Sequence, residues 1–273
     1  MKKMKKFILA SLLSCLVLLT ACGQKASPDQ GAGDNKIRLG VSPVPHEEII
    51  KALEPEFKKT GLDVEVTTFD DYVMPNLALD QGDLDANFFQ HAPYLDDFIK
   101  ERGVKLANLG AVHLEPIGFY SDKYKSVDEL EDGDEILIPN DATNGGRALI
   151  LLEKAGVIKL NDPSNLAVTE KDITENPKNL KFTAVEAATI PRAYEDAAIA
   201  VINSNFALEA KLSPKKDAIA IEKSEGNPFA NIIAAREEDK DNETYKKVLE
   251  AFQSDEVRKY IEEKFDGEII PAK

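Results

Sequence analysis

Residues 87–94 read Asn-Phe-Phe-Gln-His-Ala-Pro-Tyr, a concentration of aromatic side chains in a chain that has no tryptophan and three histidines. Residues 83–86 before them predict a strand that ends near Ala86, and a helix is expected to follow and to close near Gly103. The side chains in and after the stretch have the spacing of one helix face: His91, Tyr94, Leu95, Phe98 and Ile99. Two interpretations stay open, because this face is either packed core or the wall of a ligand pocket.

The pocket interpretation follows from the position of the stretch. Open α/β sheets bind ligands at the carboxyl ends of their strands, where Phe89, His91 and Tyr94 would line an apolar slot with a few polar tips. Asn87 and Gln90 favour a pocket, because they are polar where the start of a purely structural helix would be apolar.

The rest of the chain predicts an α/β fold. Residues 37–41 alternate as a strand, residues 49–57 repeat at helix spacing and residues 63–69 form a second strand, which makes a parallel βαβ unit. Pro55 is expected to kink or divide the helix. Additional strands are predicted at residues 111–120, 135–138, 181–185, 198–202 and 229–235, and two amphipathic helices follow at the end, the second capped by Ser254.

Residues 140–147, Asn-Asp-Ala-Thr-Asn-Gly-Gly-Arg, predict a polar loop that leads into a helix at residues 148–155. Free backbone N–H groups at such a helix start favour an anion, and Arg147 would add a bidentate contact to a carboxylate. The alternative is a solvated arginine beside an ordinary turn. The loop is no phosphate-binding Walker motif, because no Gly-Lys-Ser/Thr follows it.

Two asparagines stand in apolar surroundings. Asn203 follows the buried strand 198–202 directly, and Asn231 lies inside the apolar run 229–235. A buried amide needs partners for two donors and an acceptor oxygen, so each asparagine either contacts a ligand or bonds to backbone at the end of a ladder.

The N-terminus has the features of an exported lipoprotein. Four lysines precede an apolar run at residues 7–19, which is too short to span a bilayer, and Leu-Thr-Ala-Cys at residues 19–22 resembles a lipobox. We expect a signal peptide at residues 1–21, acylation of Cys22 and a flexible tether at residues 22–35, whereas an ordinary signal peptide with an incidental cysteine is the alternative. The protein would then be anchored by lipid to the outer face of the cell membrane.

The acidic net charge limits the classes of partner that the protein can bind. The whole chain carries a net charge of −15, and removal of the four lysines leaves 30 basic against 49 acidic residues. This balance argues against nucleic-acid binding and against contact of the protein surface with anionic lipid. Cys15 would leave with the signal peptide, so the mature chain cannot form an internal disulfide.

Several segments together resemble the NlpA family of methionine-binding lipoproteins, the substrate-binding components of ABC importers. The resemblance runs from the lipobox to nearly the end of the chain, and the Phe-Gln-His-x-Pro-Tyr pattern at residues 89–94 is its most specific part. The other matching segments are residues 69–76, 85–95, 138–149, 200–203 and 227–231.

The resemblance implies a two-lobed periplasmic-binding-protein fold of type II, with the ligand cleft between the lobes. We expect one lobe at residues 36–118 plus 226–273 and the other at residues 119–225. The implied site has an aromatic and histidine wall, a carboxylate-binding arginine and polar contacts to the ligand backbone, which correspond to Tyr72, Phe89, His91, Tyr94, Asn144, Arg147, Asn203 and Asn231. The implied function is capture of L-methionine by a monomer and its delivery to a permease and ATPase complex, without cofactor, metal or catalysis.

Other functions stay open. Within the family, the cleft would prefer a methionine-containing dipeptide such as Gly-Met, or D-methionine. A zinc-binding lipoprotein would use His46, His91 and His113 with carboxylates, although these histidines lack local metal spacing. An enzyme is disfavoured, because the His-Glu-Glu sequence at residues 46–48 lacks the second histidine of a zinc protease and no Gly-x-Ser-x-Gly motif occurs.

Overall fold

The computed structural model describes residues 35–272. The predicted signal peptide, acylated Cys22 and tether therefore lie outside the described residues, apart from Asn35 at the end of the tether. Within residues 35–272, no helix combines the length and the apolar character needed to cross a membrane.

The first sheet has six strands in the order β13-β4-β12-β3-β1-β2. Its strands are β1 (Lys36–Val41), β2 (Asp63–Thr68), β3 (Ala86–His91), β4 (Leu106–Leu114), β12 (Ala230–Arg236) and β13 (Ile270–Pro271). β1 pairs with β2 and β3 in parallel, whereas β12 pairs antiparallel with both β3 and β4. The predicted parallel βαβ unit is thus confirmed.

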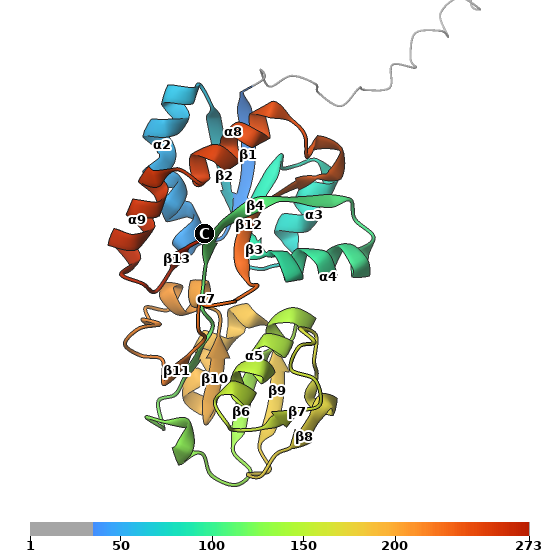
Figure 1. Ribbon diagram of the computed structural model, residues 1–273, viewed down its shortest axis with the longest axis vertical. Coiled ribbons are helices and arrows are strands. Elements are labelled where there is room, and N and C mark those ends of the chain that lie inside the picture. Colours follow the sequence, from blue (N-terminus) through green and yellow to red (C-terminus); the bar gives the residue numbers. More distant parts are fainter. Residues whose placement is uncertain (1–34, 273) are drawn as a thin grey trace, which may run out of the picture. The chain divides into compact units, whose positions relative to one another are not determined.

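Helices pack against this sheet (Figure 1). They are α2 (Glu48–Thr60), α3 (Met74–Gln81), α4 (Ala92–Arg102), α8 (Glu243–Phe252) and α9 (Asp255–Phe265), with the irregular turn η1 (Pro43–Glu47) before α2 and the short turn η6 (Glu237–Asp239) before α8. One core joins α2, α8 and α9 to the sheet, where the Phe252 ring lies 4.8 Å from Phe88 and 6.0 Å from Phe57. Each such buried ring contributes roughly 2–3 kcal/mol through removal of apolar surface from water.

The second sheet has five strands in the order β11-β5-β10-β6-β9. They are β5 (Gly118–Tyr120), β6 (Glu135–Pro139), β9 (Lys181–Val185), β10 (Ile199–Ile202) and β11 (Ala220–Ile221). The associated helices are α5 (Ala142–Lys154), α6 (Ile190–Ala193) and α7 (Ser204–Glu209). The short turns are η2 (Val127–Glu129), η3 (Glu170–Asp172), η4 (Ala187–Thr189) and η5 (Tyr194–Asp196). β7 (Lys159–Leu160) and β8 (Ile173–Glu175) form a separate antiparallel pair. The buried face of α5 packs with β6 and β10 in a separate core.

The two sheets with their helices form two lobes, which we call the six-stranded and the five-stranded lobe. The chain passes from the first to the second at residues 115–117 and returns at residues 222–229, as the green and orange strands of Figure 1 show. The predicted α/β, two-lobed fold is confirmed.

Three predicted element boundaries are wrong, and α2 is not divided at Pro55. β3 does not end at Ala86 but begins there, because residues 86–91 are all buried as a central strand between β1 and β12. The predicted strand 111–120 is two strands, since Glu115-Pro116-Ile117 connects the lobes. Pro55 lies within α2 without dividing it. Proline has no N–H group, so one carbonyl of the preceding turn lacks its helical partner. Because Pro55 is on the exposed side of the helix, this carbonyl can bond to water.

The fourth correction concerns α5, which begins at Ala142 and not at residue 148. Asp141 caps it by accepting from the Asn144 backbone N–H at 2.8 Å, so Gly145, Gly146 and Arg147 are helical and do not belong to a loop. The glycines serve close packing, because a Cβ atom would lie 2.8 Å from the Pro139 carbonyl oxygen at Gly145 and 2.4 Å from that of Leu166 at Gly146.

Candidate ligand-binding site

A small cavity lies between the lobes and is lined by residues of both. The lining contains all eight residues that the family resemblance implies, together with Gln90, whose polar character favoured a pocket, and three residues that the sequence did not single out. The full set is Tyr72, Phe89, Gln90, His91, Tyr94, Glu115, Asn144, Arg147, Asn203, Ser204, Asn205 and Asn231.

The six-stranded lobe supplies an aromatic wall. The rings of Tyr72, Phe89 and Tyr94 lie 5.8–6.2 Å apart in tilted and edge-to-face arrangements. Tyr94 donates its hydroxyl to the Tyr72 carbonyl at 3.0 Å, and Tyr72 donates to Asn205 Oδ1 across the lobes at 2.6 Å. Burial raises the pKa of both phenols, which therefore remain hydrogen-bond donors.

His91 is the polar tip of this wall, and its tautomer follows from its neighbours. Its Nδ1 caps α4 by accepting from the Tyr94 backbone N–H at 3.1 Å, so the ring proton is on Nε2. Nε2 then donates to Asn144 Oδ1 in the other lobe, at 3.1 Å. Burial, with Arg147 close by, lowers the pKa of His91 to about 3, so the imidazole is neutral.

Beneath the wall, three amides form a buried network. Asn76 Oδ1 accepts from Asn87 at 2.8 Å and from Gln90 at 2.7 Å, and Gln90 also donates to Asn87 Oδ1 at 2.9 Å. Residues 87 and 90 are therefore polar for different reasons. Gln90 lines the cavity, whereas Asn87 is fully buried and serves the amide network.

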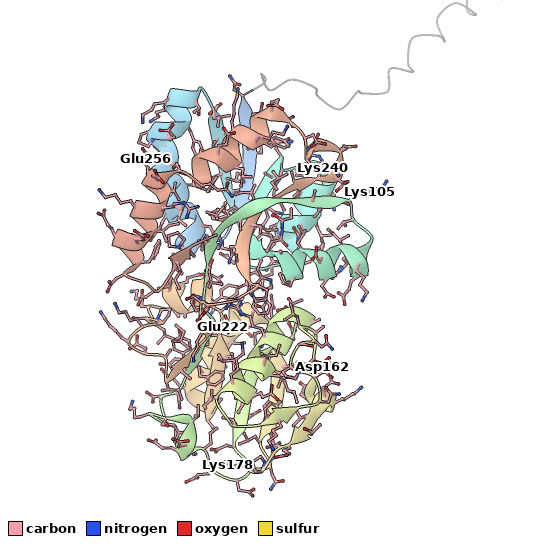
Figure 2. All side chains as sticks on the ribbon, in the orientation of Figure 1. Lys105, Asp162, Lys178, Glu222, Lys240 and Glu256 are labelled. Atoms are coloured by element: carbon pink, nitrogen blue, oxygen red, sulfur yellow. The ribbon has the colours of Figure 1, made fainter. Side chains whose placement is uncertain are left out.

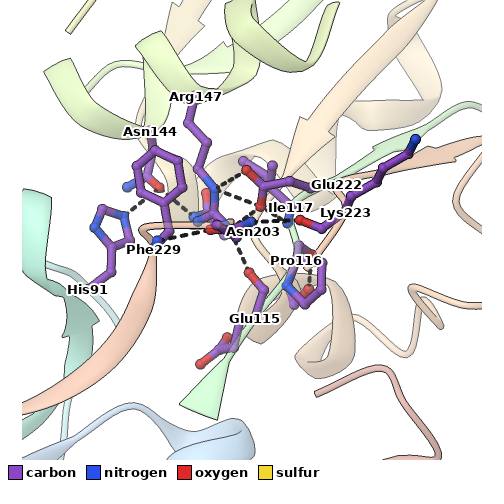
Figure 3. A network of polar contacts seen from close by, with 12 residues as sticks. His91, Glu115, Pro116, Ile117, Asn144, Arg147, Asn203, Glu222, Lys223 and Phe229 are labelled. Carbon is purple, nitrogen blue, oxygen red and sulfur yellow. Dashed lines mark hydrogen bonds and ion pairs between the residues drawn. The ribbon is translucent and has the colours of Figure 1, made fainter. Parts of the chain in front are cut away.

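The five-stranded lobe supplies Arg147 from α5. Its guanidinium, 3% exposed, forms an ion pair with Glu222 through Nε and Nη2 at 2.5–3.1 Å, and Nη2 also donates to the Glu115 carbonyl at 2.7 Å (Figure 3). The Phe229 ring stacks 4.4 Å from the guanidinium carbon. Among the described residues, no acceptor bonds to Nη1, which leaves that nitrogen for an anion in the cavity.

The partners of Arg147 come from both segments that connect the lobes. Glu115 lies in the first connection, whereas Glu222 and Phe229 lie in the second. Figure 2 shows Glu222 at the junction between the lobes, where it is buried, unlike the exposed labelled residues Asp162 and Glu256. Sequence reasoning missed Glu222, because a glutamate 75 residues from Arg147 carries no local signal for pairing with it.

The three predicted asparagines differ in their contacts. The Asn144 amide is satisfied by Asp141, His91 and Asn203, so it orients other groups of the site. Asn203 donates to Asn144 Oδ1 at 2.9 Å, but its own Oδ1 is buried without a partner. Asn231 lies on β12, with its Oδ1 3.3 Å from His46 Nε2.

A second polar centre adjoins the cavity. His46 and His113 place their Nε2 atoms 3.1 and 2.8 Å from the same Oε1 of Glu115, and all three side chains are buried. Burial lowers the pKa of His46 to about 4 and that of His113 to about 3, and it raises the pKa of Glu115. Of the zinc set predicted as an alternative, His46 and His113 lie close together with one carboxylate, Glu115, whereas His91 is not part of this group.

Comparisons with known proteins agree with this architecture. The NlpA lipoprotein family model matches residues 37–273. The chain is 45% identical over 268 residues to the D-methionine-binding lipoprotein MetQ of Escherichia coli K12, and the match covers 97% of each protein.

Two solved structures extend the similarity to the fold. A nutrient binding protein from Burkholderia cenocepacia, bound to methionine, has a TM-score of 0.84 and 45% identity, covering 87% of this chain and all of the other. An ABC transporter periplasmic substrate-binding protein from Coxiella burnetii has a TM-score of 0.82 and 38% identity, with coverage of 86% and 100%. The chain belongs to the NlpA lipoprotein family.

Proposed function

We propose that the protein is the lipid-anchored solute-binding component of an ABC importer and that it captures L-methionine in the cavity between its lobes. One observation carries this proposal. The same small cavity contains an aromatic wall and the buried guanidinium of Arg147, whose Nη1 has no acceptor among the described residues. An α-carboxylate matches the guanidinium, and a polarizable thioether gains from contact with the aromatic ring edges. The relatives named for methionine binding support the same ligand.

In this proposal, the lobes comprise residues 36–118 plus 226–273 and residues 119–225. Tyr72, Phe89, His91 and Tyr94 face the ligand side chain, Arg147 takes its carboxylate, and Asn203 and Asn231 contact its backbone, while Asn144 holds His91 and Asn203 in place. Cys22 carries the lipid that keeps the protein at the outer face of the cell membrane. A permease with its ATPase receives the ligand from the monomer, and the protein itself catalyses no reaction.

D-methionine is the second candidate, because the E. coli relative carries that name. A Gly-Met dipeptide is the third, since it presents the same carboxylate and thioether. The test is isothermal titration of the mature protein, unfolded and refolded to remove carried ligand, with L-methionine, D-methionine, Gly-Met and zinc.

Tight binding of L-methionine that Arg147→Ala abolishes is expected. A preference for D-methionine or Gly-Met would keep the importer role and change the substrate. Binding of zinc without binding of any of the three organic ligands would overturn the proposal.

A further inference from the structure

The second connection between the lobes ends in an aromatic ring that contacts both of them. Phe229 directly precedes β12, whose first residue Ala230 pairs with Leu114 of β4, so the Phe229 backbone is anchored to the six-stranded lobe. Its ring nevertheless covers the Arg147 guanidinium of the five-stranded lobe, with the guanidinium carbon 4.4 Å from the ring centroid. Phe229 is buried, but it is outside the set of described residues that line the cavity. It therefore joins the lobes from behind the cavity.

The same ring also contacts the aromatic wall. The His91 imidazole lies 5.0 Å from the Phe229 ring in an edge-to-face arrangement, and Figure 3 shows Phe229 between His91 and Arg147. His91 and Arg147 come from opposite lobes, and both line the cavity. Phe229 thus connects the proposed carboxylate-binding group to the polar tip of the aromatic wall.

The second connection is braced by its own hydrogen bonds. Asn227 accepts from the Phe229 backbone N–H at 2.9 Å and donates to the Lys223 carbonyl at 3.1 Å. At the other end, the Glu222 backbone N–H donates to the Ile117 carbonyl at 3.0 Å, and the Glu222 side chain accepts from the Ile117 N–H at 3.3 Å. Because the backbone is held at both ends, the position of the ring depends on how the two lobes meet.

Arg147 can hold this ring and a carboxylate at the same time. A guanidinium donates hydrogen bonds within its plane and stacks on aromatic rings through its face. Glu222 occupies Nε and Nη2 in that plane, whereas Nη1 has no acceptor among the described residues. A carboxylate at Nη1 would complete the contacts in the plane and fix the face that the Phe229 ring covers.

We propose that Phe229 is a positioning residue that couples the occupation of Arg147 to the approach of the two lobes. A carboxylate that fixes the guanidinium also fixes the ring, and the ring holds His91 and the start of β12 against the five-stranded lobe. The inference rests on the proposed function and deepens it, because it assigns control of the site to a residue that does not line the cavity. Loss of the ring should therefore weaken methionine binding and loosen the contact between the lobes.

The experiment combines calorimetry with a distance measurement between the lobes. Spin labels are attached through Lys100→Cys on α4 and Lys171→Cys in η3, two exposed positions in different lobes, in mature protein that carries Cys22→Ser. Double electron–electron resonance gives the distribution of label distances with and without saturating methionine. We expect one narrow distance for the methionine-bound protein that retains Phe229.

Phe229→Leu keeps an apolar side chain but removes the ring face. Methionine affinity should fall by about 10-fold, because a buried cation–π contact is lost. At saturating methionine, the label distances should remain broadly distributed. A folded Phe229→Leu protein with wild-type affinity, or with the wild-type distance distribution at saturation, would overturn the inference alone. Failure of the wild type to bind methionine would overturn the proposed function, and the inference with it.

Two further variants separate this role from packing. Phe229→Tyr keeps a ring and should restore the narrow distribution, with methionine affinity within about 3-fold of the wild type. Phe182→Leu makes the matched substitution in the core of the five-stranded lobe, outside the described lining of the cavity, and should leave both readouts unchanged. Equal effects of Phe182→Leu and Phe229→Leu would overturn the inference.

A structure of the wild type with methionine tests the coupling even if Phe229→Leu does not fold. The Phe229 ring centroid is expected to stay within about 6 Å of the Arg147 guanidinium carbon and within about 7 Å of the His91 ring. Loss of either contact in the methionine-bound protein would overturn the inference. A ligand carboxylate that does not contact Arg147 would overturn both the inference and the proposed role of that arginine.

Discussion

The wall of the cavity built by β3, α4 and Tyr72 is mainly aromatic, whereas the wall built by α5 and the start of α7 consists of amides, one hydroxyl and one guanidinium. In the aromatic wall, Tyr72, Phe89 and Tyr94 share their contacts, so the loss of one ring leaves the others in place. Behind the polar wall, Arg147 pairs with Glu222, and among the described residues this is the carboxylate to which the guanidinium is bonded. We therefore expect the polar wall to determine whether a ligand binds and the aromatic wall to determine which side chain it carries.

The sharpest test of this contrast is Arg147→Ala. It removes the proposed carboxylate contact and leaves Glu222 buried without its cation, so methionine affinity should fall by at least about 1,000-fold and unfolding free energy by about 3–5 kcal/mol. Calorimetry and urea denaturation measure the two effects. Arg102→Ala is the control, since that arginine is exposed and lies over the Phe98 ring; a similar loss in both variants would contradict the assignment.

Glu222→Gln tests the partner of the arginine. Arg147 becomes a buried cation without a counter-ion, and the ligand-free protein should lose about 3 kcal/mol of stability. Methionine should restore part of this loss, because its carboxylate supplies the missing charge. The thermal shift on adding methionine is therefore expected to be larger in Glu222→Gln than in the wild type or in the exposed-site control Glu256→Gln. An equal shift would mean that the ligand carboxylate does not approach Arg147.

The pH dependence of stability tests the histidine of the aromatic wall. The pKa of His91 is about 3 in the folded state, against about 6.5 in the unfolded state. The contribution of the neutral imidazole to the free energy of unfolding is therefore fully present above pH 6.5 and is lost as pH falls toward 3. Between pH 6.5 and 5, the wild type should lose about 2 kcal/mol more than His91→Gln, whose side chain does not titrate. Urea denaturation without ligand at each pH gives the difference, and parallel curves would show that His91 is not buried in neutral form.

The smallest effect is expected within the aromatic wall. Phe89→Leu keeps an apolar side chain but removes one ring edge from the thioether, and such sulfur–aromatic contacts contribute about 0.3–1.5 kcal/mol. The preference for methionine over norleucine should therefore fall by about 3-fold, with little change in stability. Competition titrations measure this ratio. A loss as large as that of Arg147→Ala would contradict the division of roles between the walls.

Much of the fold was predictable because its signals are local. The alternation at residues 37–41, the helix spacing of residues 49–57 and the Ser254 cap each depend on side chains within one turn or one strand. The errors arose where tertiary packing overrode such signals. β3 extends through residues that were expected to form a loop. α5 begins before two glycines because Asp141 caps it there, and glycine is required at these positions because a Cβ atom would clash with neighbouring carbonyl groups.

The residues of the candidate site likewise fall into those that the sequence predicted and those that it missed. The eight residues that the family resemblance implied all line one cavity. Glu115 and Glu222 were missed, because glutamate is abundant in this acidic chain and nothing near them in the sequence distinguishes them.

The sequence by itself determined the α/β order, the aromatic and histidine run and the family to which the chain belongs. The tertiary structure decided the partner of each polar group: Glu222 for Arg147, the His46 and His113 imidazoles for Glu115, and Asn144 for His91. The reason is physical, because these pairs join segments that are distant in the chain, and their contacts depend on strand register and on how the two lobes meet.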